Sequence, residues 1–105
     1  ASMTQISDDN RFEWDSDKNE KNKIKHGLSF EHVLPVFDDP FFFERYDKEH
    51  SNSEEDRYFG LGCIQGLVIV ATVYTEKSRI RIISARMASP KEEEIYNEYC
   101  KNINR

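Results

Sequence analysis

The sequence has no long apolar run. No stretch of its 105 residues approaches the ~20 consecutive apolar residues that a membrane-spanning helix needs. No segment resembles a secretory signal peptide either. These absences predict a cytoplasmic protein with no membrane partner, and the length allows one domain built around a single core.

Cysteine is also scarce. Cys63 and Cys100 are the two cysteines, and they lack the CxxC spacing of a zinc or redox motif. Without a secretion signal, they are expected to be reduced thiols. Asp38 and Asp39 precede Pro40 and are typical of a turn, and no third acidic ligand is suitably spaced. We therefore expect no metal and no cofactor.

The chain lacks a positive net charge. Its formal charge is −5 and its pI is near 5.2, whereas a simple nucleic-acid binder is usually basic. The charges are unevenly distributed, and two segments are basic although the total is negative. Residues 57–91 hold six cations and one anion, and residues 18–25 hold four lysines and one glutamate. The local field decides what a surface attracts, so these two basic segments are the informative feature.

The predicted fold class is α+β, with helices packed on a mainly antiparallel four-stranded sheet. Residues 1–10 are polar and predicted to be a disordered tail, whose first three residues resemble a vector remnant; residues 11–105 are predicted to form one domain. Strands are expected at residues 11–14, 41–45, 57–65, 67–75 and 79–85. An exposed loop is expected at residues 48–56.

Three helices are expected from their terminal residues. The first begins at Asp15 or Ser16 and ends before Gly27, and its surface is almost entirely polar. Ser29 caps a second, which Pro35 should shorten or kink. The third starts at a Ser-Pro-Lys-Glu capping box over residues 89–92.

The segment RIRIISAR, residues 79–86, places arginines in alternation with isoleucines. On a strand, Arg79 and Arg81 share one face while the neighbouring isoleucines point to the core. Arg86 ends the strand, and Arg57 begins a neighbouring one. Surface arginines commonly pair with carboxylates, but the basic segment holds one acid. This scarcity favours phosphate, which guanidinium binds through two parallel hydrogen bonds.

Other side chains suit RNA chemistry. Lys18 and Lys25 lie on one stripe of the first predicted helix. His26 ends that helix, where the dipole favours a charged imidazole that can protonate a leaving oxygen. Glu55 precedes Arg57 and can accept the proton of a ribose hydroxyl, and Ser84 can bind phosphate. His26 and Glu55 each have a plain alternative, namely a helix cap and a solvated loop residue.

Several blocks together resemble the BrnT family of small bacterial toxins. They are FEWD at residues 12–15, KHGLSFE at 25–31, VFDDP at 36–40 and RIRIISAR at 79–86. The resemblance covers about residues 11 to 99. It implies a fold similar to RelE-type ribonucleases and a metal-independent endoribonuclease that inhibits translation.

The resemblance also implies partners and site residues. It implies RNA as substrate, a BrnA-type antitoxin with a ribbon-helix-helix DNA-binding part, and repression of the operon by the complex, in which the chain can also form a homodimer. Position by position, it implies catalytic roles for His26, Arg57, Arg81, Ser84 and Arg86, and RNA-binding roles for Lys18, Lys25, Glu55 and Arg79.

Two other functions stay open from the residues. One is a degenerate toxin that only docks the antitoxin and assists operon repression. The other is a metal-dependent nuclease. Our leading hypothesis is attack by the 2′-hydroxyl on the adjacent phosphate, which yields a 2′,3′-cyclic phosphate and a 5′-hydroxyl.

Overall fold

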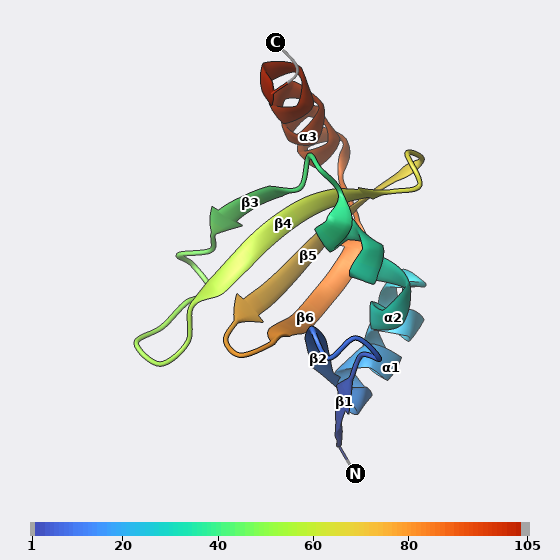
Figure 1. The fold of residues 1–105 in the computed structure, drawn as a ribbon, viewed down its shortest axis with the longest axis vertical. Coiled ribbons are helices and arrows are strands. Elements are labelled where there is room, and N and C mark those ends of the chain that lie inside the picture. Colours follow the sequence, from blue (N-terminus) through green and yellow to red (C-terminus); the bar gives the residue numbers. More distant parts are fainter. Residues whose placement is uncertain (1, 104–105) are drawn as a thin grey trace.

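The computed structural model describes residues 2–103, which form one mixed sheet flanked by helices (Figure 1). Their bounds, in chain order, are β1 (Thr4–Ile6), β2 (Phe12–Asp15), α1 (Ser16–His26), α2 (Phe30–Val33), the 3-10 helix η1 (Leu34–Asp38), β3 (Phe43–Tyr46), β4 (Arg57–Ile64), β5 (Val68–Glu76), β6 (Ile80–Met87) and α3 (Pro90–Ile103). No helix within the described residues has the length and apolar character to cross a membrane.

The sheet contains six strands in the order β1-β2-β6-β5-β4-β3. Strand β2 runs parallel to β6, and the other four pairings are antiparallel. The α+β class is confirmed, but the prediction of a four-stranded sheet is wrong. Hairpins between neighbouring segments can be read from local turns, whereas a parallel pairing joins strands that are far apart in the chain and leaves no local signal.

The first strand lies in the segment predicted as a disordered tail. That prediction is wrong for Thr4–Ile6, which pairs antiparallel with β2. Residues Met3 and Ser16 exchange backbone and side-chain hydrogen bonds of 2.8 and 3.0 Å. All three β1 residues are exposed, so no apolar pattern marks the strand. Residue 1 and residues 104–105, which the tail and domain predictions include, lie outside the described residues.

The predicted helix ends are confirmed. The Asp15 side chain accepts a hydrogen bond from the Lys18 backbone N–H, and Gly27 ends α1 in the left-handed conformation, with φ of 71°. Pro35 coincides with the change from α2 to the 3-10 helix η1. At α3, the Ser89 and Glu92 side chains exchange capping-box hydrogen bonds of 3.2 and 2.9 Å.

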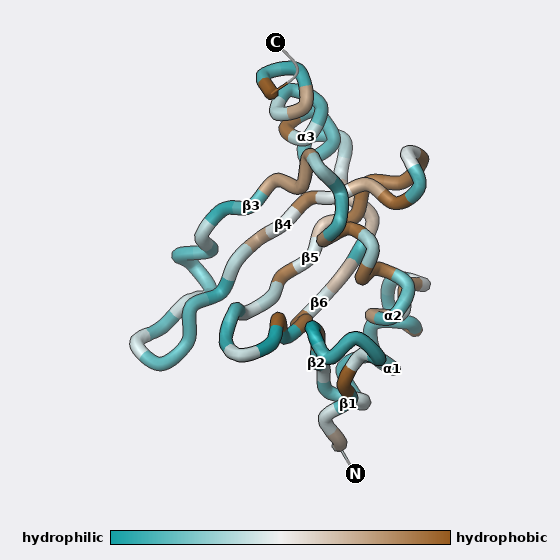
Figure 2. Tube along the Cα trace, viewed as in Figure 1, coloured by the Kyte–Doolittle hydropathy of each residue, from teal (hydrophilic) through white to brown (hydrophobic). Residues whose placement is uncertain are grey.

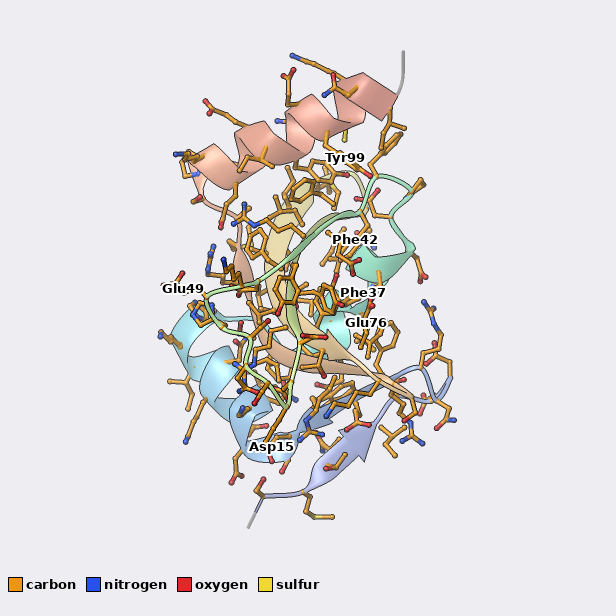
Figure 3. All side chains as sticks on the ribbon, turned by 90° about the vertical axis from the view of Figure 1, so that its left-hand side faces the viewer. Asp15, Phe37, Phe42, Glu49, Glu76 and Tyr99 are labelled. Atoms are coloured by element: carbon orange, nitrogen blue, oxygen red, sulfur yellow. The ribbon has the colours of Figure 1, made fainter. Side chains whose placement is uncertain are left out.

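Each sheet face packs a separate core. One face carries Tyr74 and Ile82 and is covered by α2 and η1 through Phe30, Val33 and Val36. The opposite face holds a smaller core around Tyr96 of α3. Apolar residues are concentrated in the central strands, η1 and the turn between β4 and β5, while the loop between β3 and β4 is hydrophilic (Figure 2). Helix α1 lies on the side of the sheet away from α2 and η1, and Glu49 of the loop before β4 is on the α1 side (Figure 3).

Helix α1 docks through amide side chains. Its one large apolar residue, Ile24, is 87 % exposed, whereas Asn19 and Asn22 are buried. The Asn22 amide donates to the Ala85 carbonyl at 2.8 Å and accepts from the Ala85 N–H at 3.2 Å. Because β2 pairs only with the first part of β6, Asn22 takes the place of a strand partner at Ala85, beyond the last β2–β6 pair.

Replacing Asn22 by alanine is expected to lower the free energy of unfolding by about 3 kcal/mol, because each buried backbone group left unpaired costs roughly 1–3 kcal/mol. Urea denaturation monitored by circular dichroism measures this change. Asn97→Ala, at an exposed asparagine of α3, is the matched control and should change stability by less than about 0.5 kcal/mol. Equal losses in the two variants would contradict the docking role of Asn22.

Candidate active site

A row of four side chains crosses the face of the sheet that α1 flanks. The register pairs Glu13 with Arg81, Arg81 with Thr75, and Thr75 with Arg57, across β2, β6, β5 and β4. Directly paired residues of neighbouring strands point to the same face, with Cβ atoms about 5 Å apart. The fold therefore brings Arg57 and Arg81, from separate hairpins, to either side of Thr75.

Carboxylates hold these arginines. Glu13 lies 2.5 Å from Arg81 and 3.6 Å from Arg79, measured between guanidinium nitrogen and carboxylate oxygen. Glu55 accepts a hydrogen bond of 2.9 Å from Arg57 Nε. The scarcity of acids within the basic segment does not leave these arginines unpaired, because the acids come from β2 and the loop before β4.

The carboxylates do not cancel the positive charge. Two glutamates face three arginines, and Arg57 lowers the pKa of Glu55, with smaller contributions from Lys77 and Lys18. Between 29 % and 33 % of each arginine side chain stays exposed. We call this surface, formed by Arg57, Arg79, Arg81, Lys18 and Lys77, the cationic face. It keeps an excess of cations that are open to an anion from solvent.

Thr75 lies buried at the centre of the row. Only 1 % of the residue is exposed. Among the described residues, its Oγ1 is the one buried side-chain oxygen or nitrogen without a hydrogen-bond partner. A buried hydroxyl normally has a partner, so this atom is an unused polar group between two guanidinium-bearing residues.

A second cluster lies between α1 and β6. The hollow, about 260 Å³ in volume, is lined by residues Lys18, Lys21, Asn22, Lys25, His26, Ile83 and Ser84. A β-bulge shapes it, because Val73 pairs with Ser84 while Tyr74 pairs with Ile82, which leaves Ile83 as an extra residue. The structure thus brings together four predicted residues, Lys18, Lys25, His26 and Ser84, and Lys18 also acts on Glu55 of the cationic face.

Arg86 lies apart from the row of four side chains. It pairs with Ala71, four residues along β5 from Thr75, which places it about 13 Å from the row. Its guanidinium forms two hydrogen bonds with Glu92, of 2.6 and 2.9 Å. The structure therefore does not bring Arg86 together with Arg57 and Arg81; it joins the end of β6 to the start of α3.

Two residues of the row, Glu13 and Thr75, are not among the predicted site residues. Glu13 lies in a predicted short strand, and its place beside Arg81 depends on the parallel β2–β6 pairing. Thr75 ends an apolar run that predicts a buried strand. The alternation of side chains along the strand does mark Thr75, since it shares a face with Val73 and Ala71 and differs from them in carrying a hydroxyl.

Among the described residues, no three His, Cys, Asp or Glu side chains are grouped to hold a metal ion.

Fold and site define a small α+β protein with one cationic sheet face. Over residues 14–92 the chain matches the family described as ribonuclease toxin, BrnT, of type II toxin–antitoxin system, and it belongs to that family. The chain is similar to the crystal structure of the Brucella abortus ribonuclease toxin, BrnT, with a TM-score of 0.54 and 28 % sequence identity. The alignment covers 72 % of this chain and 92 % of the other. No curated protein sequence matches the chain.

The family implies ribonuclease activity, RNA targets and an antitoxin partner at the level of its members. The matched residues include all the predicted site residues, from Lys18 to Arg86, together with Thr75. Glu13 precedes the matched region by one position.

The Arg86–Glu92 pair yields a prediction about pH. Arg86 and the capping hydrogen bonds lower the pKa of Glu92 from 4.5 to about 2. Because the folded-state pKa is depressed, the ionised carboxylate stabilises the fold above pH 4.5, and this contribution is lost as the pH falls toward 2. Glu92→Gln should therefore lower Tm at pH 7, by roughly 5 °C, and the difference from wild type should shrink at acid pH.

Thermal unfolding of both proteins between pH 7 and pH 2.5 provides the measurement. Glu93→Gln removes the adjacent, exposed carboxylate of α3 and is the matched control, with a Tm within about 1 °C of wild type. A difference between wild type and Glu92→Gln that stays constant with pH would contradict the assignment.

Proposed function

We propose that this chain is a metal-independent endoribonuclease that cleaves RNA and inhibits translation, as the toxin of a type II pair. The carrying observation is the cross-strand register that sets Arg57 and Arg81 on either side of Thr75, on an open cationic face. The shared family supports the reaction class.

The two arginines suit a single phosphodiester. Their strands are separated by β5 alone, so their backbones lie about 10 Å apart at 4.7–4.9 Å per strand. Long arginine side chains from both sides can converge on a phosphate between them. Each guanidinium offers paired N–H donors that match phosphate oxygens, and both stabilise the charge that builds up at phosphorus in the transition state.

Proton transfer needs an acceptor and a donor. Glu55 adjoins Arg57, which keeps the pKa of this carboxylate low and therefore keeps it ionised. In the proposed reaction it takes the proton of the 2′-hydroxyl as the 2′-oxygen attacks phosphorus. The bond from phosphorus to the 5′-oxygen breaks, and His26 in the hollow gives its proton to that oxygen. The products are a 2′,3′-cyclic phosphate and a 5′-hydroxyl.

The remaining predicted residues suit RNA binding. Lys18 and Lys25 line the hollow beside Ser84, and Lys18 also helps to lower the pKa of Glu55 beside Arg57. Lys18, Lys25 and Arg79 would contact phosphates on either side of the cleaved one, while Ser84 binds phosphate within the hollow. We assign Arg86 to the joint between β6 and α3, and we propose a BrnA-type ribbon-helix-helix antitoxin as the protein partner.

Removing Arg57 or Arg81 should lower the cleavage rate more than removing His26 does. Arg57→Ala or Arg81→Ala is expected to lower kcat for RNA cleavage by about 10²–10³-fold, the cost of one transition-state donor. His26→Ala should lower it less, because general acid catalysis can be partly replaced by water. Arg86→Ala should act mainly on stability. Cleavage of a fluorogenic RNA and colony counts after induction measure these effects.

Arg11→Ala is the matched control, since Arg11 is exposed and pairs with Asp9 and Asp38 away from the row. It should keep the wild-type rate. If Arg57→Ala and Arg81→Ala cleave RNA as fast as Arg11→Ala, the proposed role of the two arginines at the phosphate is contradicted.

Cleavage is expected to persist in EDTA and to decline with rising salt, because phosphate contacts release bound counterions. Loss of activity in EDTA would indicate a metal-dependent nuclease. Intact RNA together with tight antitoxin binding would favour the binding module, and either result would overturn the proposal.

A further inference from the structure

Strand β5 contains two buried threonines with opposite hydrogen-bonding states. Both Thr72 and Thr75 are 1 % exposed. Thr72 Oγ1 donates to the Ser84 carbonyl at 2.8 Å, whereas Thr75 Oγ1 has no partner. Valine has nearly the same shape as threonine and suits a strand better, so nothing in the packing requires a hydroxyl at position 75. The unpaired hydroxyl is a cost to the fold that a ligand can offset.

The surroundings of Thr75 decide what that ligand is. Its cross-strand neighbours on the same face are Arg57 and Arg81, and Lys18 and Lys77 act on the same region through Glu55. A hydroxyl that lies between cationic side chains suits an anionic acceptor. Glu55 and Glu13 form ion pairs with Arg57 and Arg81, and neither carboxylate accepts a hydrogen bond from Thr75 Oγ1 in the free protein.

We propose that Thr75 Oγ1 is the floor of the phosphate site and donates a hydrogen bond to a non-bridging oxygen of the scissile phosphodiester. This inference rests on the proposed function, and it adds a third hydrogen-bond donor to Arg57 and Arg81 at the phosphate. When RNA binds, the guanidinium groups of Arg57 and Arg81 turn from their glutamates toward the phosphate and uncover the hydroxyl. Glu13 and Glu55 hold the arginines in place until the anion arrives.

The proposal makes an unusual prediction about stability. Thr75→Val removes a buried hydroxyl that lacks a partner, so Tm should stay unchanged or rise. Thr72→Val removes a hydroxyl that has a partner, from the same strand and at the same burial, and should lower Tm. Thermal unfolding of the two variants without RNA compares them directly. A fall in Tm for Thr75→Val as large as that for Thr72→Val would show that the hydroxyl serves the fold and would overturn the proposal.

The same variant should weaken phosphate binding. A 2′-O-methyl RNA oligonucleotide cannot be cleaved, because its 2′-oxygen is blocked, and it keeps every phosphate. Fluorescence anisotropy should show that Thr75→Val binds this probe about tenfold more weakly than wild type, the usual effect of losing a hydrogen bond to a charged group. Thr75→Ser keeps the hydroxyl and should restore most of the affinity. Cleavage of unmodified RNA by Thr75→Val should fall in kcat as well as in affinity.

The outcomes separate this inference from the ribonuclease proposal. Weaker probe binding by Thr75→Val, with a wild-type protein that cleaves no RNA, supports the phosphate site and overturns the proposed catalysis. Cleavage by wild type with unchanged probe binding and kcat in Thr75→Val supports the catalysis and overturns the role of Thr75. If wild type does not bind the probe at all, both proposals fail.

Discussion

The parallel pairing of β2 with β6 is the constraint on which the site depends. It sets Glu13 beside Arg81, and it directs the chain from β2 into α1, which then runs along the remaining edge of β6. Asn22 completes that edge with two hydrogen bonds to Ala85. A change in this register would separate the lysines of α1 from the arginines of the central strands, because a slip of one residue reverses the face of each side chain.

The two faces of the sheet are used differently. One is filled by α2 and η1, with Tyr74 and Phe30 fully buried. Burial and the hydrogen bond to Glu44 raise the pKa of Tyr74, which keeps its hydroxyl protonated in this core. On the opposite face α3 covers one end, α1 runs along one side, and charged residues occupy the area between. The aromatic core thus gives rigidity to strands whose other face stays open for binding.

The acidic total charge and the cationic face are compatible. Glu13 and Glu55 form ion pairs with the arginines and fix their positions. The local excess of positive charge remains, since two glutamates pair with three arginines. Partly exposed ion pairs of this kind contribute little to stability. They therefore cost little to exchange for a phosphate, whereas the bidentate Arg86–Glu92 pair, with its additional capping hydrogen bonds, is part of the framework.

The sequence by itself determined the helix ends at Asp15, Gly27 and Ser89, the hairpins of β4, β5 and β6, and the common face of Arg79 and Arg81. These features depend on capping side chains, left-handed glycine and strand alternation, all of which act within a few residues. Only the tertiary structure decided that Glu13 neutralises part of the arginine charge, that Thr75 lies unpaired between Arg57 and Arg81, and that Arg86 belongs to a different contact. The Glu13–Arg81 contact arises from the pairing of β2 with β6, two strands that are far apart in the chain. The place of Thr75 depends on the exact register of the two hairpins, which is fixed by burial of the whole sheet and not by any local pattern. The Arg86–Glu92 contact depends on how α3 leaves the end of β6.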